Sequence, residues 1–83
     1  MVDDVNFVYH KRVSNVRQKL GRNIAKLRLK KEITQEKLAE ATEYSVNQIA
    51  SIENGRRSPS LEGLEKIAIV LDLEIWELFY FGP

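Results

Sequence analysis

The segment from Thr34 to Gly55 constrains the fold of this chain more than any other, because it holds the start and stop signals of two short helices. The Thr34 hydroxyl can accept a backbone N–H, as a residue at a helix start does. Ser45 and a glutamine three residues later fit a capping box, which starts a second helix at Val46. Asn54 and Gly55 end that helix, since glycine readily adopts the left-handed conformation found at helix ends. The sequence therefore predicts two short helices joined by a tight turn.

Each of these helices has a side that is predicted to be buried. Leu38 and Ala39 form the buried pair of the first helix, and Ile49 and Ile52 share one face of the second. The opposite arc of the second helix is small, polar and uncharged, and consists of Val46, Asn47, Ala50, Ser51 and Asn54. Such an arc can enter a DNA major groove and reach base edges. A merely solvated helix face remains an equal alternative on this pattern alone.

Several motifs agree with one known family. They are T-Q-E-x-L-A from Thr34, I-E-N-G-R-x-x-P from Ile52, and the ending L-D-L-x-x-x-x-L-F. On these motifs the chain resembles the helix-turn-helix of phage repressors and Cro, an XRE-like family that includes restriction–modification controller proteins. The resemblance covers roughly Leu20 to Phe79. Two positions depart from it: Glu43 stands where glycine is usual, so the turn needs a positive φ, and Thr42 stands where an apolar residue is common.

The resemblance implies an all-α, lambda-repressor-like domain of five helices that binds specific sequences in double-stranded DNA. It implies that the helix starting at Val46 reads bases through Val46, Asn47 and Ser51, and we add Ala50, which lies on the same arc. It also implies contacts with the DNA backbone from Gln35, Asn54 and Arg56. Because helix starts and arginine side chains bind phosphates, we add Thr34, Ser45, Gln48 and Arg57 to these backbone contacts. Finally, it implies a partly buried ion pair between Arg28 and Glu53 that ties the recognition helix to the first helix.

Charge is distributed unevenly although the net charge is only +1. Nine Lys or Arg and no acid lie between His10 and Lys31, whereas five acids and one Lys lie between Glu62 and Pro83. A basic front is the electrostatic footprint expected of a surface that meets a phosphate backbone. A solubilising helix surface is the alternative, and the long stretch without acids favours the first interpretation.

The remaining helices follow from apolar spacing and caps. We expect a first helix from about Val16 to Lys31, a fourth capped by Ser60, and a fifth from Glu74 to about Tyr80. The expected buried side chains of these helices and their connections are Val16, Leu20, Ile24, Leu27, Ile33, Leu61, Leu64, Ile67, Ala68, Leu71, Leu73 and Leu78. We therefore divide the chain into an N-terminal extension, residues 1–14, and a helix-turn-helix domain, residues 15–83.

The N-terminal extension is the least readable part of the sequence. Its apolar residues alternate as in a strand over residues 5–9 and are also spaced as in a helix over residues 5–16, so the pattern is ambiguous. A cap near Asn15 favours a helix that begins only after it. The extension could cover the core, join a dimer interface or lie along DNA, and a partly ordered terminus is equally plausible.

The last part of the chain has more aromatic side chains than so small a core can hold. A surplus of this kind near a terminus is a candidate interface. We assign a homodimer contact to Ile75, Trp76, Phe79, Tyr80 and Phe81. A cap of aromatic side chains over the domain's own core is the alternative.

Composition excludes several classes of function. The chain has no cysteine, so it has no disulfide, no Cys-based zinc site and no thiol nucleophile. It shows no membrane-spanning run and no signal-peptide pattern, and we expect a cytoplasmic protein. The glutamates at 32, 36, 40 and 43 are interpreted as solvated charges, so no metal, cofactor or enzymatic activity is expected. One alternative remains open: an antitoxin that represses its own operon and also binds a toxin protein.

Overall fold

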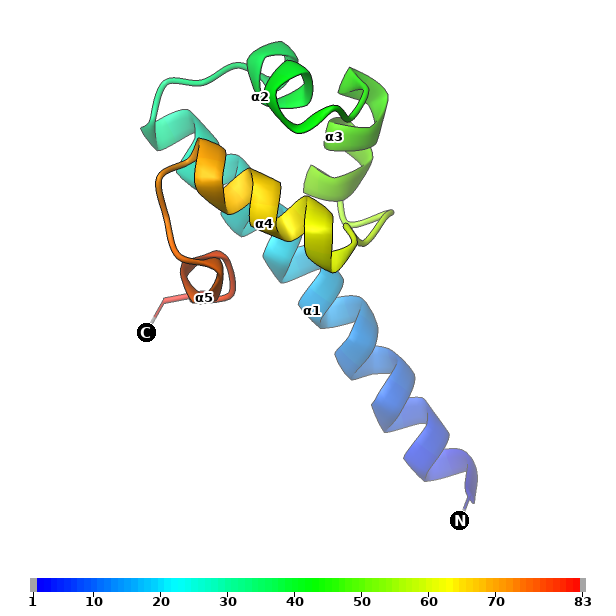
Figure 1. The fold of residues 1–83 in the computed structure, drawn as a ribbon. Coiled ribbons are helices and arrows are strands. Elements are labelled where there is room, and N and C mark those ends of the chain that lie inside the picture. The colour runs from blue at the N-terminus through cyan, green and yellow to red at the C-terminus, as the bar shows by residue number, and fades with distance from the viewer. Residues whose placement is uncertain (1, 83) are drawn as a thin grey trace.

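The protein is described from a computed structural model, which gives the backbone of residues 2–82 and the side chains of residues 15–82. Within residues 2–82 every regular element is a helix, as predicted, and the expected lambda-repressor-like arrangement is present. The helices are α1 (Val2–Lys30), α2 (Gln35–Thr42), α3 (Val46–Glu53), α4 (Leu61–Val70) and α5 (Ile75–Leu78). In Figure 1 α2 and α3 lie together at one end, and α5 lies beside α1 near the C-terminus.

Helix α1 is longer than the sequence predicted. The expected start near Val16 is wrong, because α1 begins at Val2 and runs without a break past Asn15. No glycine or proline occurs before Gly21, so nothing in the backbone chemistry forces a break, and the cap near Asn15 is not used. The strand alternative for residues 5–9 is wrong for the same reason. The proposed roles of residues 1–14 concern side chains outside the described residues, and the division at residue 14 stays a prediction.

The caps of α2, α3 and α4 confirm the predicted helix starts. Thr34 Oγ1 accepts from Lys37 N at 3.0 Å, and Ser60 Oγ accepts from Gly63 N at 3.0 Å. At α3 the capping box around Ser45 is complete. Helix α5 is shorter than expected, ending at Leu78 instead of near Tyr80. These local bonds satisfy N–H groups that would otherwise lack partners at helix ends.

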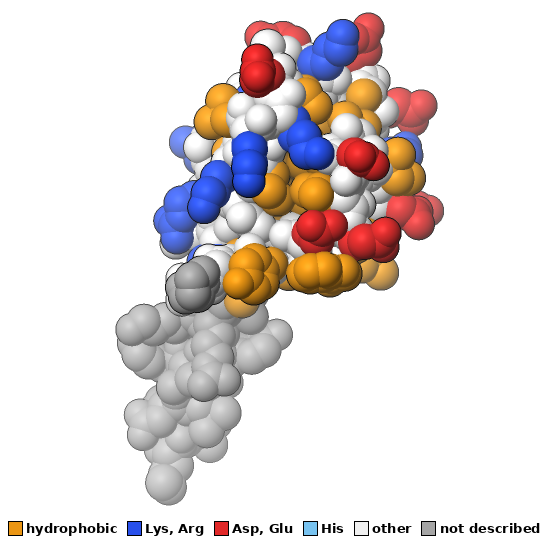
Figure 2. Space-filling model, turned by 90° about the vertical axis from the view of Figure 1, so that its left-hand side faces the viewer, with side chains coloured by type: hydrophobic (Ala, Val, Ile, Leu, Met, Phe, Trp, Pro, Cys, Tyr) orange, Lys and Arg blue, Asp and Glu red, His pale blue; other side chains and the backbone are white. Residues whose placement is uncertain are grey.

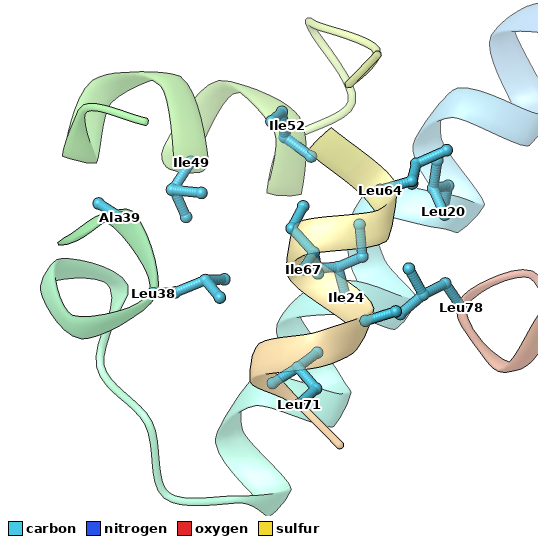
Figure 3. Close-up of a cluster of buried hydrophobic side chains, with 11 residues drawn as sticks. Leu20, Ile24, Leu38, Ala39, Ile49, Ile52, Leu64, Ile67, Leu71 and Leu78 are labelled. Carbon is cyan, nitrogen blue, oxygen red and sulfur yellow. The ribbon is translucent and has the colours of Figure 1, made fainter. Parts of the chain in front are cut away.

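The core lies where the helices converge (Figure 3), and most of it was predicted. Its buried side chains are Leu20, Ile24, Leu38, Ala39, Ile49, Ile52, Leu64, Ile67, Ala68, Leu71 and Leu78. Leu27, Ile33 and Leu73 pack partly buried against it. The prediction of burial is wrong for two residues: Val16 is 46% exposed and Leu61 is 81% exposed. Each is the first residue of its predicted apolar stripe, and it lies beyond the side chains of the neighbouring helices against which the rest of the stripe packs.

Gly21 and Asn23 of α1 set how α3 and α5 pack against this helix. A Cβ at Gly21 would overlap the carbonyl oxygen of Ile52 and lie 2.7 Å from that of Glu53, so α1 and α3 approach closely only because this residue is glycine. Asn23 Nδ2 donates to the carbonyl oxygen of Leu78 at 2.7 Å and to that of Glu77 at 3.2 Å. Asn23 therefore holds the end of α5 against α1.

Candidate nucleic-acid interface

The outer face of α3 is exposed at both ends and partly exposed in the middle. Val46 is 38% exposed, Asn47 and Asn54 are also exposed, and Ala50 and Ser51 are partly exposed. Ile49 and Ile52, on the opposite side, are each 1% exposed and belong to the core. The small, uncharged arc predicted from the sequence therefore lies on the surface, and its contact with bases stays a prediction.

The start of α3 holds two polar side chains in place at the edge of this face. Ser45 Oγ accepts from Gln48 N at 3.0 Å, and Gln48 Oε1 accepts from Ser45 N at 2.8 Å. These bonds leave the Ser45 hydroxyl proton and the Gln48 amide N–H groups available as donors. Because the positive end of the helix dipole lies at the same place, this edge suits an anion such as a DNA phosphate.

A buried ion pair joins α1 to α3, as expected from the resemblance. Arg28 Nε donates to Glu53 Oε2 at 2.7 Å and Arg28 Nη2 donates to Glu53 Oε1 at 3.2 Å. Their side chains are 10% and 6% exposed. Arg28 Nη1 also donates to the carbonyl oxygen of Ile33 at 2.7 Å, so the same guanidinium fixes the α1–α2 connection. Bidentate, charge-assisted bonds of this kind are among the stronger polar contacts in proteins.

Gln35 takes part in this network, which the sequence did not reveal. Its Nε2 donates to Glu53 Oε1 at 2.9 Å. An amide nitrogen has two hydrogens, so this bond uses one and leaves the other for an acceptor outside the domain. The position of Gln35 at the start of α2 is therefore set by the same carboxylate that binds Arg28. A contact between Gln35 and a DNA phosphate stays a prediction.

The loop after α3 presents two arginines at the C-terminal end of the outer face of α3. Gly55 has φ 77°, which ends the helix as predicted. The backbone N–H groups of Arg56 and Arg57 donate to the carbonyl oxygen of Ser51 at 2.9 and 3.3 Å, and both side chains are exposed. A tight turn thus fixes the backbone while the guanidinium groups extend into solvent.

The turn between α2 and α3 confirms the expectation raised by Glu43. This residue has φ 66°, a left-handed conformation that glycine adopts more readily than other residues. Thr42 beside it is only 2% exposed, and its hydroxyl donates to the carbonyl oxygen of Leu38 at 2.7 Å. A threonine is thus accommodated at an apolar position because its hydroxyl is bonded to the backbone of its own helix.

Aromatic side chains gather at the other end of the domain. The assigned interface residues are all exposed: Ile75 39%, Trp76 66%, Phe79 40%, Tyr80 61% and Phe81 40%. Figure 2 shows hydrophobic side chains along the lower edge of this face, with Lys and Arg on one side and Asp and Glu on the other. The alternative of an aromatic cap over the core does not describe Trp76 and Tyr80, which are mostly in solvent. Their role in a dimer stays a prediction.

A family described as "Helix-turn-helix" matches residues 24–78 of this chain, which include the whole of α2, α3 and α4. The chain belongs to the helix-turn-helix family. Control protein C.MunI of a Mycoplasma species is 35% identical over 68 residues, which cover 81% of this chain and 92% of the relative. Control protein C.BamHI of Bacillus amyloliquefaciens is 35% identical over 69 residues, which cover 82% of this chain and 85% of the relative.

Solved structures agree with this assignment. The restriction-modification controller protein C.AhdI from Aeromonas hydrophila has a TM-score of 0.71 and 34% identity, over 74% of this chain and 92% of that one. The clp gene regulator ClgR from Corynebacterium glutamicum has a TM-score of 0.77 and 27% identity, over 80% of this chain and 70% of that one. The chain is therefore a helix-turn-helix protein of the transcriptional regulator type.

Some contacts that position this helix-turn-helix could not be predicted from the sequence. Arg17 Nε donates to Ser58 Oγ at 3.2 Å and fastens the loop after α3 to α1. Arg17 and Ser58 are 41 positions apart, and no local pattern pairs them.

Among the described residues, no group of His, Cys, Asp or Glu side chains is placed to hold a metal ion. None of the helices described has both the length and the apolar composition that a membrane span requires.

Proposed function

We propose that this chain is a transcriptional regulator that binds a specific sequence in double-stranded DNA. The observation that supports this most is the exposed, uncharged outer face of α3, which has donors for phosphates at both of its ends. The names of C.MunI, C.BamHI and C.AhdI as control or controller proteins support a role in regulation. These relatives are named for control, and their names give no support to the antitoxin alternative.

In this proposal the base-reading and phosphate-binding residues have separate roles. Val46, Asn47, Ala50 and Ser51 meet base edges in the major groove, where an amide can bond adenine and an apolar group can contact a thymine methyl. The residues around the rim hold phosphates and set the register of the helix. They are Thr34, Gln35, Ser45, Gln48, Asn54, Arg56 and Arg57.

Two alanine substitutions separate these roles. Asn47→Ala should relax the preference at one position of each half-site by ~1–3 kcal/mol, because alanine cannot bond a base edge. Arg56→Ala should weaken binding to every sequence alike and reduce the salt dependence, because alanine cannot neutralise a phosphate. Binding titrations on specific and random duplexes at several salt concentrations measure both effects. Equal weakening on both duplexes for both variants would show that Asn47 does not read a base.

We also propose that the regulator acts as a two-fold homodimer on a near-palindromic operator. A single domain this small makes few phosphate contacts, so two are needed for tight binding. The exposed aromatics of the C-terminal segment supply an apolar contact, and a cavity of about 490 Å³ opens beside them between α1 and this segment. Recognition helices in successive major grooves would place the half-site centres ~34–36 Å apart.

Trp76→Glu tests this contact. The side chain is 66% exposed in the single chain, so the substitution should leave the fold intact. At a two-fold interface the new charge is buried twice, so the variant should be monomeric at micromolar concentration by sedimentation. Leu61→Glu is the matched control, because Leu61 is 81% exposed on α4 and the variant should remain dimeric. A Trp76→Glu dimer of wild-type strength would refute this interface.

A further inference from the structure

The outer face of α1 has a row of basic side chains that the proposed recognition surface does not use. Lys19, Arg22 and Lys26 are spaced three and four residues apart, so they share one side of the helix. All three are exposed. No acid occurs in α1 between residues 15 and 30, and none of the three is in an ion pair among the residues whose side chains are described.

This row borders the recognition helix. A groove of about 830 Å³ is bounded by α1, the end of α3 and the C-terminal segment, and its walls include Lys19, Arg22, Lys26, Asn54 and Phe81. Glu53 also lines it, but its carboxylate oxygens accept bonds from Arg28 and Gln35. The groove is therefore positively charged on balance and is continuous with Asn54, which the proposed function assigns to a phosphate.

The row is held at a fixed position relative to α3. Gly21, between Lys19 and Arg22, lies against the carbonyl oxygens of Ile52 and Glu53. One turn earlier, Arg17 is bonded to Ser58 in the loop that follows α3. The close backbone packing at Gly21 therefore sets the distance between the basic row and α3, and the exposed side-chain bond between Arg17 and Ser58 adds to it.

We propose that the groove along α1 binds the phosphate backbone of DNA outside the major groove that α3 enters, through Lys19, Arg22 and Lys26. This rests on the proposed function, because it places additional DNA contacts beside the same site. Seven residues of helix rise by ~10 Å, a row long enough to face several phosphates of one strand, whereas a small anion would meet only part of it. Lysine and arginine here meet phosphates and carry no sequence preference.

The test is the salt dependence of DNA binding by a triple variant, Lys19→Gln, Arg22→Gln and Lys26→Gln. Glutamine keeps helix propensity and all three sites are exposed, so the fold should be retained, as circular dichroism would check. The slope of log Kobs against log salt should become shallower by about two to three per protomer, since each phosphate that is no longer neutralised reduces it by about 0.9. Affinity for specific and random duplexes should fall by the same factor, which leaves sequence preference unchanged.

A matched pair of single variants controls for overall charge. Lys26→Gln and Lys66→Gln each remove one positive charge, but Lys66 lies on α4 and pairs with Glu43 at 3.2 Å. Only Lys26→Gln should reduce the slope. A wild-type slope in the triple variant, or an equal reduction by Lys66→Gln, would overturn the α1 contact while leaving α3 recognition standing. Absence of sequence preference in the wild-type chain would instead overturn the proposed function, and slopes on random duplex would still decide the α1 contact.

Discussion

Replacing Arg28 with methionine is expected to destabilise the domain by about 3–5 kcal/mol, a large share of the ~5–15 kcal/mol that keeps a typical domain folded. The reason is the carboxylate left behind. Glu53 is 8% exposed, and Arg28 supplies two of its hydrogen bonds. Without the guanidinium, a buried charge keeps only the bond from Gln35, and the carbonyl oxygen of Ile33 is left without this donor. Denaturant unfolding monitored by circular dichroism measures the destabilisation.

A second substitution shows whether Arg28→Met destabilises the domain through the unpaired carboxylate of Glu53 or through weaker packing. Adding Glu53→Met to Arg28→Met removes the unpaired carboxylate, so the double variant should be more stable than Arg28→Met alone. Buried ion pairs replaced as a whole by apolar residues often lose little stability. If instead the two destabilising effects simply added, or if Arg28→Met unfolded like the wild type, the ion pair would not be the tie between α1 and α3.

Gly21→Ala is expected to have the second large effect on stability. On an exposed helix this change stabilises by about 1 kcal/mol, because alanine has the higher helix propensity. Here the added Cβ would overlap the backbone of Ile52 and Glu53, so α1 must move away from α3. Overpacking typically costs ~1–3 kcal/mol, and we expect the upper end because the obstacle is backbone. Thermal and denaturant unfolding would show the decrease in stability.

Gly63→Ala is the matched control for this prediction. Gly63 is also a buried helical glycine, and an added Cβ there would overlap the hydroxyl of Tyr44 and lie 2.9 Å from its Cζ. The obstacle is the end of a side chain, which can shift, so the destabilisation should be smaller. Equal destabilisation at the two glycines, or a more stable Gly21→Ala variant, would contradict the close approach of α1 and α3.

The helix-turn-helix segment was predictable because its signals are local. Thr34 and Ser45 bond to backbone N–H groups three residues away, and Gly55 adopts the required positive φ by itself. The start of α1 and the exposure of Val16 and Leu61 were not predictable in this way. Apolar spacing identifies which side chains share a face of a helix. It does not show how far the neighbouring helix extends along that face, and Val16 and Leu61 are exposed because no neighbour covers them. The start of α1 was missed because a cap sequence marks a possible start and does not break a longer helix.

Most of the contacts that position the candidate site could not be predicted from the sequence. The bond of Asn23 to the end of α5 joins residues about 55 positions apart. The need for glycine at position 21 is visible only once the backbone of α3 lies beside it. Arg28 and Glu53 were paired in advance through the resemblance, since neither residue type nor spacing connects α1 with α3. The inclusion of Gln35 in that network required the structure.

Base reading by α3 can be tested by selecting bound sequences from a pool of random double-stranded DNA. If the outer face of α3 reads bases in a two-fold dimer, the selected sequences should share a near-palindrome whose half-site centres lie ~34–36 Å apart, one turn of the duplex. The Asn47→Ala variant should select the same half-sites with one position relaxed. If repeated rounds with the folded wild-type chain enriched no sequence, α3 would not read bases.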